Sequence, residues 1–146
     1  KERGMHILLN ASPVDETLKH MDLSGVTWLM VNETEGAEIT GERKPEKIIA
    51  QLLALYPAMN VILTLGTDGS IFQNKEKKIC QPCFPAQTVD TTAAGDTFTG
   101  YFLMAQEKGF SAEQCLSIAA QASAIAVSRK GASVSVPVWA ELQMDL

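Results

Sequence analysis

The stretch "WLMVNETEGAEITG", residues 28–41, shows the plan on which this chain is built. An apolar run at residues 28–31 leads through polar Asn32 into a short helical pattern that stops at Gly41. A short apolar run that ends in a turn is typical of a buried strand, and the pattern after it is typical of a helix. This stretch therefore predicts one strand followed by one helix, which is the repeating unit of an α/β fold.

The same plan recurs on both sides of this stretch. "MHILLNASP", residues 5–13, and "NVILTLG", residues 60–66, are further short apolar runs that end in turn residues. Between them, Pro45 begins a stronger helix with an apolar stripe, and Pro57 closes it. Residues 70–90 hold short alternating runs divided by a charged turn, which favours an antiparallel hairpin or sheet edge.

The last third of the chain is predicted to be mainly helical. Residues 97–108 carry an apolar face, and Ser111 with Gln114 matches a capping box that opens a second, largely buried helix. Pro137 is expected to open a final short helix. Parallel strands with crossover helices and one antiparallel margin together predict a three-layer αβα sandwich with a mostly parallel sheet.

Length and composition narrow the functional classes. The 146 residues, 46% of them hydrophobic, are enough for one globular domain, and a net charge of −5 disfavours nucleic acid and anionic membranes as partners. The sequence has no apolar stretch of the roughly 18 residues that a membrane span needs. Three cysteines are too few for a disulfide scaffold, so we expect a cytoplasmic protein.

"DTTAAGDTFTG", residues 90–100, places small residues and an acid at the mouth of a predicted helix. Ala93, Ala94 and Gly95 cannot cover their own N–H groups, so the main chain could approach a phosphate at the positive end of the helix. Asp96 could then accept a proton from an attacking hydroxyl. The alternative is that Asp96 is an ordinary N-cap beside a tight turn.

Two more strands are predicted to end in polar residues. "TLGTDG", residues 64–69, has two glycines around a turn, and "NETE", residues 32–35, offers Asn32 and Glu35 as oxygen ligands for magnesium or its waters. Taken singly, the first is typical of a plain turn and the second of a helix cap. In open α/β sheets, however, ligands bind beyond the carboxyl ends of the strands, where all three stretches are expected.

In series, these motifs resemble the ribokinase-like, or PfkB, carbohydrate kinases. "DTTAAGDTF" is similar to the second signature of that family, "NETE" to its metal motif, and "TLGTDG" to its nucleotide-phosphate turn. "SAIAVSRKGASVSVP", residues 123–137, resembles the tail of the members that phosphorylate ribose. The order and spacing agree over nearly the whole chain, and the second signature is highly specific.

The resemblance implies a role for each matching residue. Asp96 would be the catalytic base that contacts the sugar hydroxyl, and the amides of Ala93, Ala94 and Gly95 would stabilise the transferred phosphoryl group. Asn32 and Glu35 would hold magnesium through water. The residues implied in ATP binding are Asn32, Thr64, Leu65, Gly66, Thr67, Asp68, Gly69, Gly95, Asp96 and Ala120. A potassium ion would be held, mostly by main-chain carbonyls, at Asp90, Thr92, Ala126, Arg129, Gly131 and Ser135.

Members of the family are about twice as long as this chain. The resemblance therefore implies that residues 1–146 are the C-terminal, nucleotide-binding part of a kinase whose N-terminal half carries most sugar contacts. We expect ATP-dependent phosphorylation of a sugar hydroxyl, with ribose to ribose 5-phosphate as the first candidate, in a full-length homodimer. The open alternatives are a non-catalytic nucleotide-binding module, or a parent kinase that acts on another sugar or a nucleoside.

Cys80 and Cys83 have the spacing of a redox or metal pair. They lie in a strand-like region without a second pair or a nearby histidine, which favours a structural or incidental role. Walker A and GxGxxG patterns are absent from the sequence, which disfavours P-loop and Rossmann cofactor sites.

Overall fold

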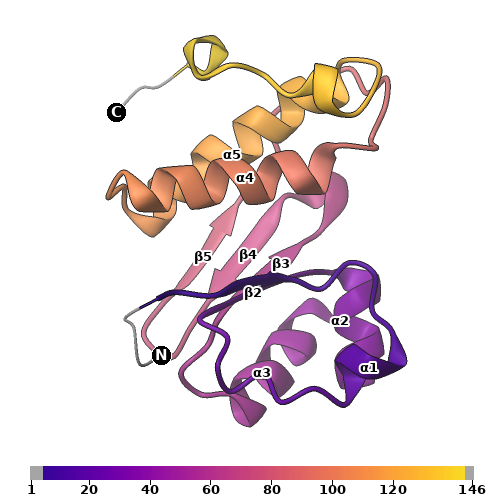
Figure 1. Ribbon diagram of the computed structural model, residues 1–146, viewed down its shortest axis with the longest axis vertical. Helices are drawn as coiled ribbons and strands as arrows, with labels where there is room; N and C mark the ends of the chain where they lie inside the picture. Colours follow the sequence, from indigo (N-terminus) through magenta and orange to yellow (C-terminus); the bar gives the residue numbers. More distant parts are fainter. Residues whose placement is uncertain (1–4, 144–146) are drawn as a thin grey trace. The chain divides into compact units, whose positions relative to one another are not determined.

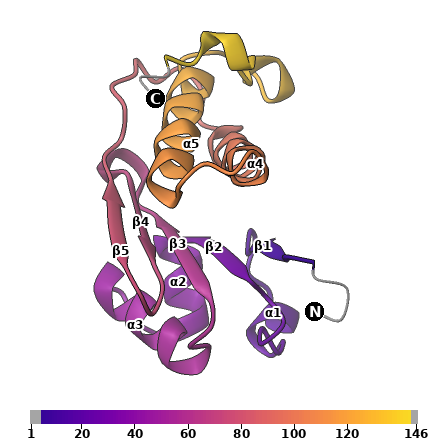
Figure 2. The same ribbon diagram turned by 90° about the vertical axis from the view of Figure 1, so that its left-hand side faces the viewer.

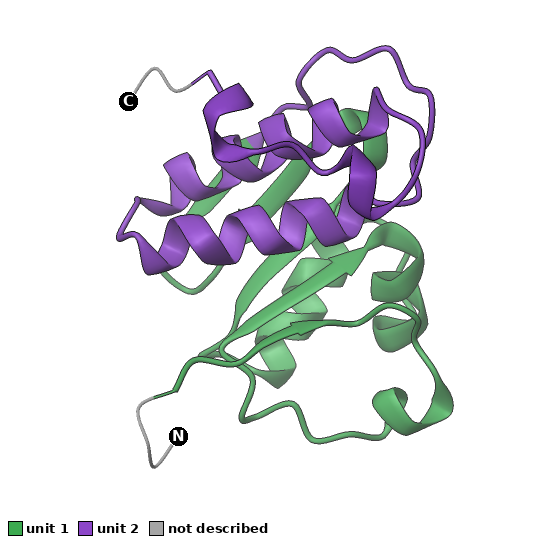
Figure 3. Ribbon diagram, turned by 45° about the horizontal axis from the view of Figure 1, so that its top comes forward, with its two compact units in different colours: residues 1–80 green, residues 81–146 purple. Residues whose placement is uncertain are grey.

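The computed structural model describes residues 5–143, and the chain divides into two compact units, residues 1–80 and residues 81–146 (Figure 3). The first unit carries the sheet and three helices. Its elements, in chain order, are β1 (Leu8–Asn10), α1 (Glu16–Lys19), β2 (Trp28–Asn32), α2 (Glu33–Thr40), α3 (Pro45–Leu55), β3 (Asn60–Thr64), the 3₁₀ turn η1 (Gly66–Asp68), β4 (Ser70–Gln73) and β5 (Lys78–Gln81).

The five strands form one sheet in the order β1-β2-β3-β4-β5. β1 pairs with β2 and β2 pairs with β3 in parallel, whereas β3 and β4 are antiparallel. Figure 2 shows β1 beside β2 at one edge of this sheet. The predicted parallel sheet with an antiparallel margin is therefore confirmed, and its parallel strands end together at the edge that carries Asn32 and Thr64.

Helices α2 and α3 pack against β2 and β3 (Figure 1). The capping box at Asn32 begins α2, and Gly41 ends it in the left-handed conformation with φ of 76°. Pro45 is the first residue of α3, where its missing N–H costs no hydrogen bond. The core of the unit is a buried apolar cluster: Ala11, Leu23, Leu29, Val31, Ile48, Ile49, Leu52, Met59, Val61, Leu63 and Ile71.

The second unit is built on two long helices, α4 (Ala94–Glu107) and α5 (Ala112–Val127), which pack closely on each other. The predicted apolar face of α4 is buried, and the predicted capping box of Ser111 and Gln114 begins α5. Two 3₁₀ turns follow, η2 (Ser133–Ser135) and η3 (Trp139–Glu141).

Two predicted boundaries in this unit are wrong. α4 begins at Ala94, three residues before the expected start, because the first turn of a helix needs no apolar stripe and the sequence pattern starts only with the stripe. Pro137 does not open a helix: its carbonyl oxygen accepts a hydrogen bond from the Tyr101 hydroxyl, and the chain makes one 3₁₀ turn, η3, instead.

Among residues 5–143, no helix is both long enough and apolar enough to cross a membrane.

Candidate active site

Asp96 lies in the first turn of α4, on the exposed surface of the second unit. The N-cap of this helix is Ala93, which makes no side-chain capping bond. The alternative that Asp96 is the N-cap is therefore wrong, because the helix starts two residues before it. A carboxylate in this position is stabilised by the positive end of the helix and remains available to a ligand.

The main-chain amides beside Asp96 are only partly available. The Ala94 N–H donates to the Thr91 carbonyl oxygen at 3.1 Å and so closes a turn ahead of α4. The N–H groups of Gly95 and Asp96 lie in the first turn, where a helix offers no acceptor of its own. A Cβ placed on Gly95 would meet no atom within 4 Å, so the space in front of this main chain is open. Gly95 and Asp96 are thus better placed than Ala94 to bind an anion.

Two hydroxyls that the sequence analysis did not single out hold this turn in place. Ser123 of α5 donates its hydroxyl to the Ala94 carbonyl oxygen at 3.0 Å, and Thr99 donates to the Gly95 carbonyl oxygen at 2.8 Å. Ser123 stands between alanines at residues 122 and 124, and a hydroxyl among such small apolar side chains is the signal that could have marked it. Its bond fixes the start of α4 against α5.

A cavity of about 220 Å³ adjoins Asp96 in the second unit. Its lining residues are Asp96, Thr97, Gly100, Tyr101, Met104 and Val136. The Thr97 hydroxyl is buried and finds no hydrogen-bond partner among the described residues. The cavity combines one acid, Asp96, and two hydroxyl side chains, Thr97 and Tyr101, with mainly apolar walls, and the Tyr101 hydroxyl is already bonded to the Pro137 carbonyl oxygen.

In the first unit, sheet pairing brings two of the predicted motifs together. Asn32, the last residue of β2, is the direct partner of Thr64, the last residue of β3. The Asn32 side chain accepts a hydrogen bond from the Glu35 N–H at 2.9 Å, and the buried Glu35 carboxylate accepts one from the Asn32 N–H at 2.8 Å. This reciprocal cap leaves the second carboxylate oxygen of Glu35 for a water molecule, which fits a water-mediated contact to magnesium.

Residues 64–69 form a tight turn directly after β3. The Leu65 N–H donates to the Gly69 carbonyl oxygen at 2.8 Å, and the Gly69 N–H donates to the Gly66 carbonyl oxygen at 3.2 Å. Gly66 and Gly69 have φ of 56° and 91°, which favour glycine. Gly66, Thr67 and Asp68 are exposed, so the turn presents its main chain to solvent at the same sheet edge as Asn32.

The predicted potassium ligands of the second unit gather around the end of α5. The Asp90 carboxylate accepts hydrogen bonds from the N–H and hydroxyl of Thr92 and, at 3.0 Å, from the N–H of Gly131. These donors lower the pKa of Asp90 from 3.8 to about 2, so the group stays ionised. The Asp90 N–H donates in turn to the carbonyl oxygen of Val127, the last residue of α5.

The other predicted potassium ligands, Ala126, Arg129 and Ser135, are also held by hydrogen bonds near the end of α5. The Arg129 N–H donates to the Ala126 carbonyl oxygen at 3.1 Å, and buried Ser135 donates its hydroxyl to the Ala132 carbonyl oxygen at 2.7 Å. Carboxylate, hydroxyl and carbonyl oxygens are hard donors that suit an alkali cation. The Arg129 guanidinium is bound to Glu141, which agrees with a main-chain role for Arg129.

Other candidate residues are less informative. Ala120, one of the residues implied in ATP binding, is buried in α5. Cys80 and Cys83 are exposed free thiols, and the described residues contain no cluster of three or more His, Cys, Asp or Glu side chains that could hold a metal ion.

Residues 1–139 match the model of the pfkB family carbohydrate kinases. Ribokinase from Arabidopsis thaliana is 38% identical over 143 residues, which cover 94% of this chain and 38% of that protein. Ribokinase from Bacillus subtilis is 35% identical over 137 residues, covering 94% of this chain and 45% of that protein. The structure of the Arabidopsis thaliana ribokinase complexed with ribose and ATP is similar with a TM-score of 0.82 and 36% identity, over 94% of this chain and 46% of that chain. The likeness confirms the predicted α/β fold, and the chain spans less than half the length of these relatives.

Proposed function

Because the chain belongs to the pfkB family of carbohydrate kinases, we propose that it is the nucleotide-binding part of a longer kinase. This kinase transfers the terminal phosphoryl group of ATP to a sugar hydroxyl. The observation that carries the proposal is the position of Asp96, an exposed carboxylate in the first turn of α4 that is not used as a cap. Ribose is the first candidate acceptor, because ribokinases from two organisms are among the relatives of this chain.

Asp96 acts as the base in this proposal. Its carboxylate accepts the proton of the acceptor hydroxyl while the oxygen attacks the phosphorus atom. A carboxylate is a weak base, but a loose phosphoryl transition state needs mostly positioning and charge stabilisation. The N–H groups of Gly95 and Asp96, at the positive end of α4, supply that stabilisation, while the Ala94 N–H stays bonded to the Thr91 carbonyl oxygen.

The edge of the sheet formed by β2 and β3 is assigned to the nucleotide. The exposed main chain of the 64–69 turn and the side chain of Asn32 bind ATP, and Glu35 orders water around magnesium. Magnesium, when bound, neutralises charge on the phosphates. The reciprocal cap between Asn32 and Glu35 holds both side chains in fixed positions for this task.

The oxygen donors around Asp90 are assigned to potassium. Thr92, Ala126, Arg129, Gly131 and Ser135 complete this set. Because Thr92 lies two residues ahead of α4, a cation held there supports the turn that carries the proposed anion site.

The proposal is tested by assaying the complete protein with magnesium-ATP and a panel of ribose, other sugars and nucleosides. We expect ADP release to depend on a sugar, and ribose 5-phosphate to form when ribose is the acceptor. The rate should fall when a bulky organic cation replaces potassium. Turnover of none of the sugars would contradict the proposal, and preference for a nucleoside would reassign the acceptor.

A second candidate is that the 146-residue chain by itself is a non-catalytic nucleotide-binding module. It is favoured by the chain spanning 38% and 45% of the two relatives. Calorimetry with magnesium-ATP, next to the same kinase assay on the isolated chain, separates the two candidates. Nucleotide binding without phosphorylation supports the module, and robust phosphorylation by the isolated chain excludes it.

A further inference from the structure

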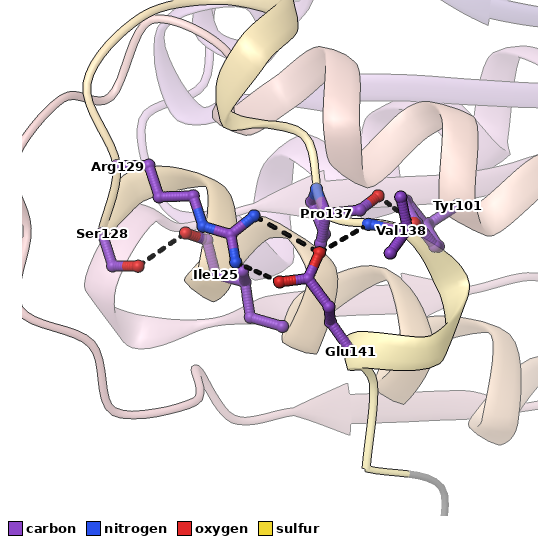
Figure 4. Close-up of polar contacts among 7 residues, drawn as sticks. All are labelled: Tyr101, Ile125, Ser128, Arg129, Pro137, Val138 and Glu141. Carbon is purple, nitrogen blue, oxygen red and sulfur yellow. Dashed lines mark hydrogen bonds and ion pairs between the residues drawn. The ribbon is translucent and has the colours of Figure 1, made fainter.

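The segment 137–142 connects the two helices that carry the second unit. At one end, the Tyr101 hydroxyl of α4 donates a hydrogen bond to the Pro137 carbonyl oxygen. At the other end, the Arg129 guanidinium, just beyond α5, is bound to the Glu141 carboxylate (Figure 4). Between these ends, the ring of Trp139 stacks on the ring of Tyr101 with centroids 6.2 Å apart. The segment therefore ties the middle of α4 to the loop that follows α5.

Glu141 is the centre of this connection. One carboxylate oxygen accepts a bond from Arg129 Nη2, while the other accepts from the Val138 N–H at 2.8 Å and from Arg129 Nη1 at 3.4 Å. An arginine that meets both oxygens of a carboxylate is held in a fixed geometry, which a lysine or a neutral partner would not impose. Glu141 thus caps the start of η3 through the Val138 N–H and also fixes the side chain of Arg129.

The Arg129 side chain leaves a turn whose main chain contains proposed potassium ligands. Arg129 donates its N–H to the Ala126 carbonyl oxygen, and two residues later Gly131 donates its N–H to Asp90 at 3.0 Å. Fixing the side chain of Arg129 limits the motion of the main chain between these two bonds. A cation bound by carbonyl oxygens needs those oxygens at set distances, so a more mobile turn would bind it less tightly.

We propose that Glu141 is a positioning residue: through Arg129 it holds the turn at residues 126–131 in place and so raises the affinity of the kinase for its monovalent cation. This inference rests on the function proposed above. The side chains of Arg129 and Glu141 are 38% and 37% exposed, and an ion pair this exposed adds little to the free energy of unfolding. We therefore expect its main effect on the local geometry of the turn at residues 126–131.

The first arm of the test is hydrogen exchange on the 146-residue chain. Glu141→Gln removes the charge and keeps the shape, and we expect exchange in residues 128–138 to speed up by about two- to fivefold. Glu107→Gln is the matched control, because it removes an exposed charge from the end of α4 in the same unit. Equal exchange in Glu141→Gln and the parent chain would overturn the inference.

The second arm is the potassium dependence of the complete protein. Glu141→Gln should raise the potassium concentration for half-maximal activity by about two- to fivefold and leave the KM for ATP unchanged. Arg129→Gln should give the same shift. The double variant should shift the potassium requirement no more than either single variant, because each of the three variants removes the same ion pair between Arg129 and Glu141. A general loss of folded protein would instead lower the rate at every potassium concentration.

The outcomes separate the inference from the function beneath it. Faster exchange with an unchanged potassium requirement overturns the role of Glu141 and leaves the kinase assignment standing. A parent enzyme whose rate is the same in potassium and in a bulky organic cation overturns the potassium site and, with it, the role given to Glu141. Additive shifts in the two single variants would show that Glu141 does not act through Arg129.

Discussion

Asp90 joins the start of α4 to the loop after α5 through one carboxylate. Its partners, the hydroxyl and N–H of Thr92 and the N–H of Gly131, lower the pKa of Asp90 from 3.8 to about 2. Since the folded pKa lies below the unfolded one, ionised Asp90 stabilises the fold above about pH 3.8, and this stabilisation is lost as the pH falls towards 2.

We therefore predict that Asp90→Asn lowers the urea midpoint of the chain near neutral pH. The difference from the parent chain should shrink as the pH is lowered from about 4 to about 2, because the unfolded parent chain takes up a proton on Asp90 near pH 3.8, whereas the folded chain keeps Asp90 ionised down to about pH 2. Urea unfolding followed by circular dichroism at several pH values measures this. A difference that stays constant over that range would contradict the proposed bonding of Asp90.

Gly131 is required by its backbone conformation. Its φ is 102°, and a Cβ at this position would lie 2.8 Å from Val134 Cγ2. Gly131→Ala should destabilise the chain by about 1–3 kcal/mol. Gly100→Ala is the matched control, since Gly100 is in the interior of α4 and an added Cβ meets no atom within 4 Å. That substitution should stabilise the helix by about 0.5–1 kcal/mol, and the same sign for both would refute this explanation.

At the scale of elements, the contact between α2 and α3 depends on a glycine. A Cβ on Gly36 would lie 2.7 Å from Ile48 Cγ2, and both residues are buried. We expect Gly36→Ala to destabilise the chain, because overpacking costs about 1–3 kcal/mol and the gain in helix propensity is at most about 1 kcal/mol. Thermal unfolding measures the net change.

A second substitution at Ile48 should partly restore the stability that Gly36→Ala removes. Ile48→Leu removes the branch at Cβ that an alanine at position 36 would meet. The double variant should therefore lose less stability than the sum of the two single variants. Strict additivity would show that the two helices accommodate the extra methyl group in another way.

Element boundaries show where reading the sequence succeeds. Pro45, Gly41 and Ser111 carry their own chemistry, and each marks a helix end as predicted. The start of α4 cannot be located in this way, because Ala93 has no capping side chain and the apolar stripe begins only after Gly95. Pro137 does not open a helix, and its carbonyl oxygen instead accepts a hydrogen bond from Tyr101, 36 residues away, which no local sequence pattern reveals.

At the scale of the whole molecule, the parts of the site that repeat a local motif could be predicted. Asn32 and the 64–69 turn follow neighbouring parallel strands, so their pairing at one sheet edge follows from the order of the strands. Ser123 and Glu141 could not be predicted, because each matters through a partner distant in sequence. Long-range side-chain contacts carry no periodicity, and their residues look like ordinary surface or small-residue positions.

The division into two compact units also assigns the proposed roles to different parts of the chain. Asn32, Glu35 and the 64–69 turn belong to residues 1–80, whereas the proposed base, anion site and potassium ligands belong to residues 81–146. Substitutions in the first group should weaken ATP binding, and substitution of the base should leave it intact. Asp96 is therefore the residue at which chemistry and nucleotide binding can be separated.

Single-turnover and steady-state kinetics of Asp96→Asn in the complete protein, with ATP affinity measured by calorimetry, test the proposed role of Asp96 most directly. Removal of the base should lower kcat by about 10²–10⁴-fold, while the Kd for ATP stays within about twofold, because the base acts in the transition state. Glu107→Gln, at the other end of the same helix, should leave both unchanged. Near-parental turnover by Asp96→Asn would contradict the assignment of Asp96 as the base.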